Sequence, residues 1–446
     1  MNKNTSLSDW LTYIEQAHTK EIDMGLSRTK DLVKRLNIDF TEQFVVTVGG
    51  TNGKGTTCAL IEQICLHAGL TAGVYSSPHL VDFCERIRLN GNLISQSMLC
   101  DIFEQIDNSR KDPVQGLIDL TYFEFATLAA LKAFSNQKVD VLILEVGLGG
   151  RLDAVNVIDA DVAVITSIGL DHQAWLGDTK EKIAFEKAGI FRTNKPAIIG
   201  EETPQQSMLE YAEQIGANLI CRGEHFMFDE ATGLISIQSQ QFSAKNAKIP
   251  KQNVATALAA VNALSQSAFS RSDNVISNKL KTVYPFLART SDIQAIIDKT
   301  QLMGRHHILR QQKIDECCAI ILDVAHNEDS ALQLSRLMRT YSFDTCHIVV
   351  GMLKDKNIEI SLQVFSDINA HWYCAALPTN RGEKAERLVR AVQSSTELNT
   401  NSKIEPFETV DLAFKQALSN AQANDIILVM GSFLTVAAVL KYHASA

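Results

Sequence analysis

A glycine-rich segment lies between an apolar stretch at residues 44–46 and a helix-like stretch that starts near Thr56. Backbone N–H groups in such a turn approach phosphate oxygens closely, the positive end of the following helix faces the anion, and a lysine adds charge. In the common form of this loop, a glycine precedes the lysine by six positions and Ser or Thr directly follows it, whereas this chain has Val48 and Gly55 there. The segment therefore predicts a compact variant of a phosphate-binding loop, made of Gly50, Thr51, Asn52, Gly53, Lys54, Gly55 and Thr56.

Lys54 is the residue of this loop with a direct chemical role. An ammonium group held against the β and γ phosphates stabilises the charge that moves during phosphoryl transfer. The alternative is a solvated loop lysine, but the surrounding glycines and the preceding strand favour phosphate binding. Thr56 caps the helix, binds the nucleotide or does both, and its position is compatible with each role.

Glu145 directly follows the apolar run at residues 139–144, which predicts a buried strand. An acidic residue at the carboxyl end of a parallel strand lies at the sheet edge where ligands bind, and it suits Mg²⁺ coordination near phosphates. The alternative is a carboxylate at a loop entry with no partner. Because a charge beside such an apolar run is costly unless it meets a cation, the pattern favours the metal role.

Three other residues have weaker local signals. His172 follows an expected strand at residues 162–167, where a lone histidine is more often a surface or hydrogen-bonded residue than a metal ligand. Ser77 stands before a proline, and turn chemistry alone accounts for it. Lys187 has a helical context that is typical of an ordinary helix-surface lysine.

Strand and helix patterns alternate over residues 41–200 and again from near residue 318. Such alternation implies right-handed crossovers and parallel sheets. The pattern predicts an α/β chain, with a parallel-sheet nucleotide-binding domain followed by a smaller Rossmann-like domain. We place the boundary near residue 300, because residues 267–300 are polar and lack strand character, which gives domains 1–300 and 301–446.

The second domain also carries polar residues after an expected strand. Asp323 lies near the end of the apolar run at residues 319–324 and His326 follows it, so their side chains should reach a ligand at a sheet edge. Asn327, next to them, could equally cap the following helix. Arg305 lies near the expected domain junction, where it could touch a phosphate.

Composition narrows the class of protein further. The net charge of -9 over 446 residues argues against a general nucleic-acid surface. No apolar run approaches the roughly 20 residues of a membrane helix, and the polar first residues contain no signal core, so we expect a cytoplasmic protein. The nine cysteines, including Cys317 and Cys318, show neither zinc-ligand nor disulfide spacing, which predicts reduced core residues.

Four motifs together resemble the folylpolyglutamate synthase family, and the resemblance spans about residues 10–440. They are the stretches at residues 50–56, 75–80, 144–153 and 323–327. The family is related to the Mur peptide ligases and shares their ATP-binding core. Mur ligases carry a further domain of roughly a hundred residues ahead of the phosphate loop, for which this chain has too little room.

The resemblance implies an ATP-dependent ligase. Such an enzyme phosphorylates the carboxylate of dihydropteroate, or of a folate such as tetrahydrofolate, and the amine of L-glutamate then attacks the acyl phosphate. By resemblance, Lys54 binds the γ phosphate, and two Mg²⁺ ions are held by Ser77 with Glu145 and by Glu145 with His172. The lysine that corresponds to Lys187 is carbamylated in similar enzymes, which act as monomers.

The resemblance also implies the remaining contacts. ATP contacts are implied for Asn253, Arg305 and Asp323, and glutamate contacts for His326 and Ser432. Aromatic and acidic side chains suit a flat pterin, which stacks on rings and donates hydrogen bonds from its amino-pyrimidine edge. The implied pterin contacts are Ile22, Asp23, Met24, Gly25, Thr121, Tyr122, Phe123, Glu124, Leu152, Asp153 and Ala154.

Three other functions are compatible with the motifs. They are a monofunctional folylpolyglutamate synthase, a related Mur-type ligase that acts on another carboxylate, and an inactive nucleotide-binding switch or scaffold. The chain departs from the family pattern at Met303 and Glu328, where a proline is common.

Overall fold

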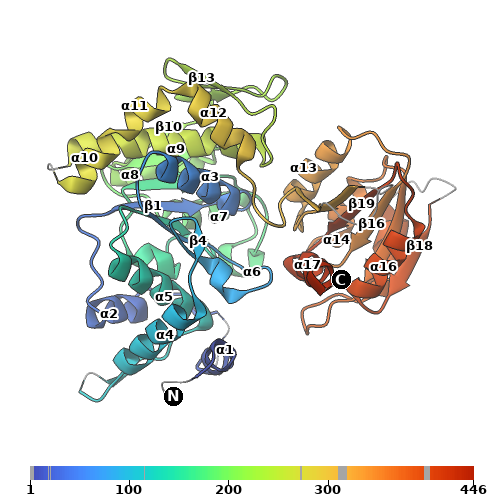
Figure 1. Ribbon diagram of the computed structural model, residues 1–446, viewed down its shortest axis with the longest axis horizontal. Helices are drawn as coiled ribbons and strands as arrows, with labels where there is room; N and C mark the ends of the chain where they lie inside the picture. Colours follow the sequence, from blue (N-terminus) through green and yellow to red (C-terminus); the bar gives the residue numbers. More distant parts are fainter. Residues whose placement is uncertain are drawn as a thin grey trace. The chain divides into compact units, whose positions relative to one another are not determined.

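The computed structural model describes residues 5–18, 20, 22–114, 116–271, 274–309, 319–395 and 402–445. The chain forms two compact units, Met1–Thr300 and Gln301–Ala446, each of which is shown in Figure 1. The seven cysteines among the described residues are free thiols, and all except Cys100 are buried, as expected for a reduced core. Cys317 and Cys318 lie outside the described residues.

An eight-stranded sheet forms the centre of the first unit, in the order β10-β9-β8-β1-β7-β2-β3-β4. Its strands are β1 (Phe44–Gly49), β2 (Ala72–Tyr75), β3 (Ile87–Leu89), β4 (Asn92–Leu93), β7 (Val141–Glu145), β8 (Val162–Ile165), β9 (Pro196–Ile199) and β10 (Asn218–Cys221). The strands from β10 to β2 are parallel, which confirms the expected α/β fold. Strands β3 and β4 add an antiparallel edge that was not expected.

Helices cover both faces of this sheet. Alternate residues of β7 enter two different cores, with Val141 and Ile143 in one and Leu142 and Leu144 in the other. Because both faces of β7 are buried, residues 141–144 are apolar on both faces and do not alternate with polar ones. In Figure 1, α3 and α9 lie on one side of β1, and α2, α4 and α5 lie on the other.

The helices of the first unit are α1 (Leu7–Gln16), α2 (Ser27–Arg35), α3 (Lys54–His67), α4 (Gln96–Arg110), α5 (Tyr122–Gln137), α6 (Gln173–Leu176), α7 (Lys180–Ala188), α8 (Gln206–Ile215), α9 (Lys251–Ser270), α10 (Val275–Lys281), α11 (Val283–Leu287) and α12 (Thr290–Lys299). Short 3-10 helices span Phe83–Arg86 and Ala154–Val157. Two small antiparallel sheets complete the unit, formed by β5 (Lys111–Asp112) with β6 (Gly116–Leu117), and by β11 (Phe226–Phe228), β12 (Leu234–Ile237) and β13 (Gln240–Ser243). Within the described residues, no helix combines the length and the apolar character that crossing a membrane requires.

The second unit is a smaller α/β domain with a six-stranded sheet in the order β14-β15-β19-β16-β17-β18. Its strands are β14 (His307–Leu309), β15 (Ala319–Leu322), β16 (Cys346–Val350), β17 (Ala370–Ala375), β18 (Ile404–Phe407) and β19 (Ile426–Met430). Its helices are α13 (Glu328–Met338), α14 (Ile358–Gln363), α15 (Ala385–Ser395), α16 (Val410–Asn420) and α17 (Phe433–Ser445). All strand pairs are parallel except that of β14 with β15, so the expected Rossmann-like sheet is confirmed with one antiparallel edge.

Asp161 is a buried carboxylate that ties the amino-terminal ends of the central strands together. It is 3% exposed, and its Oδ2 accepts a hydrogen bond from the backbone N–H of Val45 at 3.0 Å. Lys195 and Arg271 donate to the same carboxylate at 2.9 and 3.0 Å, so two cations compensate its burial.

Replacing Asp161 with alanine should lower the free energy of unfolding by about 3 kcal/mol, because the change leaves a buried N–H and two cations without their shared acceptor. Urea unfolding followed by circular dichroism measures the change. The control is Asp159→Ala, whose carboxylate is 84% exposed and pairs with Arg192. An exposed pair contributes at most about 1 kcal/mol, so equal losses in the two variants would contradict the proposed role of Asp161.

Candidate active site

The glycine-rich segment forms a tight loop between β1 and α3, at the carboxyl edge of the sheet. Gly50 has φ +138°, and a Cβ atom there would lie 1.9 Å from Thr166 Oγ1. Gly53 has φ +90°, and its Cβ would lie 2.6 Å from the amide of Asn253. At both positions the positive φ and the short distance to a neighbouring atom leave no room for a side chain. The conformation of the loop therefore requires glycine at residues 50 and 53.

The segment that follows β8 supports this loop. Thr51 donates its backbone N–H to Ser167 O at 2.7 Å, and Thr166 Oγ1 donates to Asn52 O at 2.7 Å. On the helix side, Thr56 Oγ1 donates to Gly53 O at 2.9 Å and accepts a hydrogen bond from Asn253 Nδ2 at 2.9 Å. Thr56 therefore acts in the helix start, and Asn253 lies against the loop as expected of a residue near the nucleotide.

Two lysines meet at one carbonyl group of the loop. Lys54 Nζ donates to Gly50 O at 3.1 Å and to Thr51 O at 3.2 Å, and Lys187 Nζ donates to Gly50 O at 2.9 Å. Lys187 is only 5% exposed, so the expectation of an ordinary helix-surface lysine is wrong. Its helix α7 packs its last turn against the loop, and a local helical pattern does not reveal such a distant contact.

The pKa of Lys187 is lowered to about 7, chiefly by burial and then by the charge of Lys54, against the opposing effects of Asp171 and Asp153. A lysine with this pKa is about half neutral at pH 7. Burial thus favours the neutral amine of Lys187 over its charged form.

Glu145 lies beside the phosphate loop through strand pairing. It is opposite Val48 in the parallel register of β1 and β7, and it is 5% exposed. Its Oε2 accepts a hydrogen bond from the backbone N–H of Ser77 at 3.3 Å, so the structure brings Ser77 and Glu145 together. Ser77 follows β2 and Glu145 is the last residue of β7, and the carboxyl ends of these neighbouring parallel strands meet at one edge.

His172 lies after β8 at the start of α6, has φ +53° and is exposed. In the described part of the chain, the one group of three His, Cys, Asp or Glu ligand atoms within 4.8 Å is Cys221, Glu224 and His225, which is not in the phosphate loop. Among the described residues, no group of three such ligand atoms therefore surrounds Glu145. Ser77 and Glu145 nevertheless fit Mg²⁺, which prefers oxygen ligands and is commonly bound by one or two protein groups with water and substrate phosphates.

The loop after β7 is held in shape by Asp153. Its Oδ2 accepts the backbone N–H groups of Gly147 at 3.0 Å and Leu148 at 2.8 Å, and its Oδ1 accepts that of Val155. Burial raises the pKa of Asp153 to about 6 despite these three donors. The carboxylate therefore organises the loop in addition to the pterin contact implied for it.

The structure brings together the three segments implied in pterin binding, at residues 22–25, 121–124 and 152–154. Phe123 packs on the loop that Asp153 organises, because a Cβ atom at Gly147 would lie 2.5 Å from the Phe123 ring. A Cβ atom at Gly149 would lie 3.7 Å from Met24 Cε, so the first segment reaches the same loop. Leu152, Ile22 and Gly25 are partly buried, and Ala154 is buried.

Thr121 and Glu124 form a capping box at the start of α5. Thr121 Oγ1 accepts the N–H of Glu124 at 3.2 Å, and Glu124 Oε2 accepts the N–H of Thr121 at 2.8 Å. Tyr122 lies between them, with its ring 5.8 Å from the ring of Phe83 and 5.5 Å from the Arg86 guanidinium. These contacts fix the orientation of the aromatic pair, Tyr122 and Phe123, at a helix start.

In the second unit, the expected residues also gather at the carboxyl edge of the sheet. Asp323 and His326 follow β15, Ser432 follows β19, and the two strands are paired. Arg305 lies over the Phe433 ring at 5.1 Å, and His326 lies 6.3 Å from the same ring. Burial raises the pKa of Asp323, against the opposing effect of Arg305, while the N–H groups of His306 and Ala325 bond to its carboxylate.

Two residues of this edge have clear structural partners. Ser432 is 4% exposed, its hydroxyl lies 2.7 Å from that of Thr435, and it accepts the Thr435 N–H at the start of α17. Asn327 caps α13 through Ser330, and Glu328 is the first residue of that helix. Of the two readings left open for Asn327, the structure supports the helix cap.

Two family models match the chain. Residues 48–264 match the Mur ligase middle domain, and residues 304–433 match the Mur ligase glutamate ligase domain. The phosphate loop and Glu145 lie in the first match, and Asp323 and His326 lie in the second. The chain is thus a member of the class of proteins built from these two domains of the Mur ligase type.

Curated relatives and solved structures narrow the class. The dihydrofolate synthase/folylpolyglutamate synthase of Escherichia coli (strain K12) is 39% identical over 439 residues, which cover 98% of this chain and 95% of that protein. A structure of the Escherichia coli FolC protein with DHPP and ADP matches with a TM-score of 0.85 and 38% identity, over 100% of this chain and 99% of that one. The chain belongs to the dihydrofolate synthase/folylpolyglutamate synthase family.

A further structure of a bifunctional folylpolyglutamate synthase/dihydrofolate synthase holds Mn, AMPPNP and L-glutamate. It matches with a TM-score of 0.84 and 38% identity, over 100% of this chain and 99% of that one. An ATP analogue, a divalent metal ion and the amino acid thus occupy a protein of the same fold.

Replacing Glu145 with alanine should retain the fold and raise the Mg²⁺ concentration needed for tight ATP binding by about tenfold or more, because a metal-ligating carboxylate is lost. Titration of a fluorescent ATP analogue at several Mg²⁺ concentrations measures the change, and thermal unfolding checks the fold. Glu213→Ala, an exposed carboxylate on α8, is the control. Normal Mg²⁺ dependence in Glu145→Ala would rule out the ligand role.

Proposed function

We propose that the chain is an ATP-dependent ligase that adds L-glutamate to dihydropteroate, making dihydrofolate, and to folates such as tetrahydrofolate, making folylpolyglutamates. The γ-phosphoryl group of ATP passes to the substrate carboxylate and ADP leaves. The amine of glutamate attacks the resulting acyl phosphate, an amide bond forms, and inorganic phosphate and a proton are released.

The observation that supports this proposal is that the stretch at residues 145–153 lies beside the phosphate loop and contacts the segments proposed to bind the pterin. This stretch begins with Glu145 beside the phosphate loop and Ser77. Two residues later, Gly147 packs against Phe123 and donates its N–H to Asp153, both in the segments proposed to bind pterin. A carboxylate carried by a pterin-containing molecule is in this way brought close to the phosphate loop.

We assign the phosphate chemistry to residues at the carboxyl edge of the first sheet. Lys54 holds the γ phosphate, with the backbone N–H groups at the start of α3 around the remaining phosphate oxygens. Ser77 and Glu145 would hold one Mg²⁺ and Glu145 and His172 a second. When bound, Mg²⁺ neutralises phosphate charge and favours phosphoryl transfer.

The remaining roles follow the site residues of each unit. Asn253, Arg305 and Asp323 contact the nucleotide, and His326 and Ser432 contact the incoming glutamate. The pterin lies against Tyr122 and Phe123, with Asp23 and Asp153 near its amino-pyrimidine edge. We further propose a monomer that acts in the cytoplasm and has no nucleic-acid or membrane partner.

We also propose that Lys187 carries a carbamate. Its amine is buried and has a pKa of about 7, so a large neutral fraction can attack CO₂ at neutral pH. One N–H proton is released as the C–N bond forms, and the cation becomes a carboxylate-like anion. This anion would orient Mg²⁺ or its water beside Gly50, where an uncharged or positive amine cannot.

Purified protein should release phosphate when it is given ATP, Mg²⁺, L-glutamate and either dihydropteroate or tetrahydrofolate. A coupled phosphate assay and mass spectrometry of the pterin product measure the reaction, with omission of glutamate as the control. Lys54→Met should lower kcat by about 100-fold or more, because it removes the cation that stabilises the transferred phosphoryl group.

Each substrate result has a separate meaning. Release with tetrahydrofolate alone would indicate a monofunctional folylpolyglutamate synthase. Release with neither pterin would contradict the proposed function and favour another carboxylate substrate or an inactive nucleotide-binding protein.

Removal of CO₂ and bicarbonate should lower activity, and added bicarbonate should restore it, because the carbamate dissociates in their absence. Carbon-13 NMR with labelled bicarbonate should show a carbamate signal that Lys187→Ala lacks. The signal should grow as the pH rises from 6 to 8, since the neutral amine increases as the pH passes the pKa of about 7. Active protein with only an unmodified amine would refute the carbamate.

A further inference from the structure

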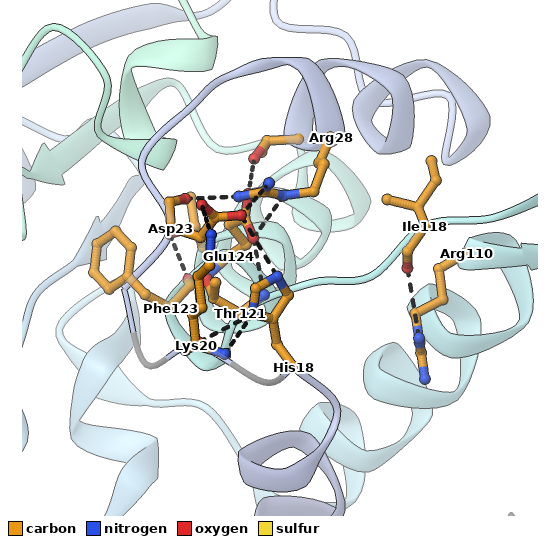
Figure 2. A network of polar contacts seen from close by, with 11 residues as sticks. His18, Lys20, Asp23, Arg28, Arg110, Ile118, Thr121, Phe123 and Glu124 are labelled. Atoms are coloured by element: carbon orange, nitrogen blue, oxygen red, sulfur yellow. Dashed lines mark hydrogen bonds and ion pairs between the residues drawn. The ribbon is translucent and has the colours of Figure 1, made fainter.

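The segment at residues 22–25, which is proposed to contact the pterin, has no regular secondary structure. No helical or strand hydrogen bonds therefore fix its backbone, and its position depends on neighbouring side chains. Arg28, the second residue of α2, makes the principal contacts with this segment. Figure 2 shows Arg28 between Asp23 and Glu124.

Arg28 holds Asp23 by both its side chain and its backbone. Its Nη1 donates to Asp23 Oδ2 at 2.6 Å, and its Nη2 donates to the Asp23 carbonyl oxygen at 2.6 Å. Hydrogen bonds to both the carboxylate and the carbonyl oxygen of Asp23 restrain its side chain and the peptide plane that follows it. Met24 is the next residue along the chain, and its side chain approaches Gly149.

The same guanidinium is anchored on the start of α5. Its Nε donates to Glu124 Oε1 at 3.0 Å and contacts Oε2 at 3.3 Å. Glu124 is 3% exposed and is itself held by the backbone N–H of Thr121. Arg28 thus fastens the segment at residues 22–25 to the helix start that presents Tyr122 and Phe123.

Arg28 is a cation that pairs with both Asp23 and Glu124. Two carboxylates, those of Asp23 and Glu124, share one guanidinium, and the next cation, Lys20, lies 3.5 Å from Asp23 with 66% of its side chain exposed. Partial burial acts to raise the pKa of Asp23, but Arg28 and Lys20 together hold it below its usual value. Without Arg28, the buried carboxylate of Glu124 would lose the guanidinium that pairs with it. Asp23 would keep its longer contacts with Lys20 and His18.

We infer that Arg28 is a positioning residue for the pterin substrate, because it sets the segment at residues 22–25 against the amino-terminal turn of α5. The inference rests on the proposed function, since it assumes that this segment and Tyr122 and Phe123 face the pterin. Arg28 acts through Asp23 and Glu124, and no contact of its own with the substrate is required.

Lysine cannot reproduce this arrangement. Arg28 uses three nitrogen atoms in one plane to reach a carboxylate, a carbonyl and a second carboxylate. A lysine has one nitrogen atom and keeps the charge, but it cannot reach all three acceptors in the same geometry. Arg28→Lys therefore tests positioning with the net charge unchanged.

Arg28→Lys should raise the KM for dihydropteroate about tenfold, because at least one charge-assisted hydrogen bond to the segment is lost. The KM values for ATP and glutamate, and kcat, should stay within about twofold of the wild-type values. The matched control is Arg35→Lys, at the other end of α2, where Arg35 donates to the carbonyl oxygens of Ser109 and Gly116. That variant should leave all three KM values unchanged.

A double-variant cycle tests whether Arg28 acts through Glu124. Glu124→Gln keeps a side chain that can complete the capping box and removes the charge that pairs with Arg28. The effect of Arg28→Lys with Glu124→Gln on the KM for dihydropteroate should be smaller than the product of the two single effects. A fully multiplicative effect would overturn action through Glu124.

Two further outcomes would overturn the positioning role. An unchanged KM for dihydropteroate in Arg28→Lys is one, and an equal rise of all three KM values, as from general damage, is the other. Amide hydrogen exchange gives a readout without turnover, since residues 22–25 should exchange faster in Arg28→Lys than in Arg35→Lys. Equal exchange in the two variants would refute the positioning role of Arg28, whether or not the wild-type protein is an active ligase. Absence of ligase activity in the wild-type protein would contradict the proposed function and leave the exchange result to decide the role of Arg28.

Discussion

The carbonyl oxygen of Gly50 accepts hydrogen bonds from two lysines, and this shared acceptor links the parts of the first site. A peptide carbonyl is only a partial negative charge and cannot neutralise two ammonium groups. The conflict is relieved at Lys187, whose burial and whose neighbour Lys54 lower its pKa to about 7. Lys54 and Lys187 share this acceptor, and Lys187 is the one of the two whose pKa is lowered.

The same contact joins the phosphate loop to the stretch that follows Glu145. The end of α7 packs directly on Gly150, where a Cβ atom would lie 2.8 Å from Lys187 O, and Arg151 donates its N–H to Glu186 O at 2.8 Å. Lys187 is therefore fixed from both sides. The end of α7 thus contacts both the phosphate loop and the loop that Asp153 organises.

Local patterns in the sequence were sufficient for the sheets and for the residues at strand ends. The strands expected at residues 139–144 and 162–167 are found as β7, at residues 141–145, and β8, at residues 162–165. Glu145 lies at the carboxyl edge of the sheet as expected. The short antiparallel edge strands β3, β4 and β14 were not predicted, because two or three residues carry too little periodicity.

The burial of Lys187 and the role of Arg28 escaped prediction for a different reason. Lys187 bonds to a residue 137 positions away, and Arg28 bonds to one 96 positions away. A contact of this kind depends on how helices dock, and neither residue has an unusual local context. Asp153 was identified only through the family resemblance. Its three hydrogen bonds with backbone N–H groups form only when the loop is folded, so the sequence did not predict them.

The segments proposed to contact the pterin lie at residues 22–25, 121–124 and 152–154, so about 130 residues of chain separate the first from the last. Contacts at such separation form only after much of the loop-closure entropy has been paid, and they appear late in folding. The phosphate loop depends on contacts of the same kind, since Lys187 bonds to Gly50 from 137 positions away and Asn253 bonds to Thr56 from 197 positions away. Neither site is therefore formed by a local stretch of chain, and both depend on completion of the sheet of the first unit.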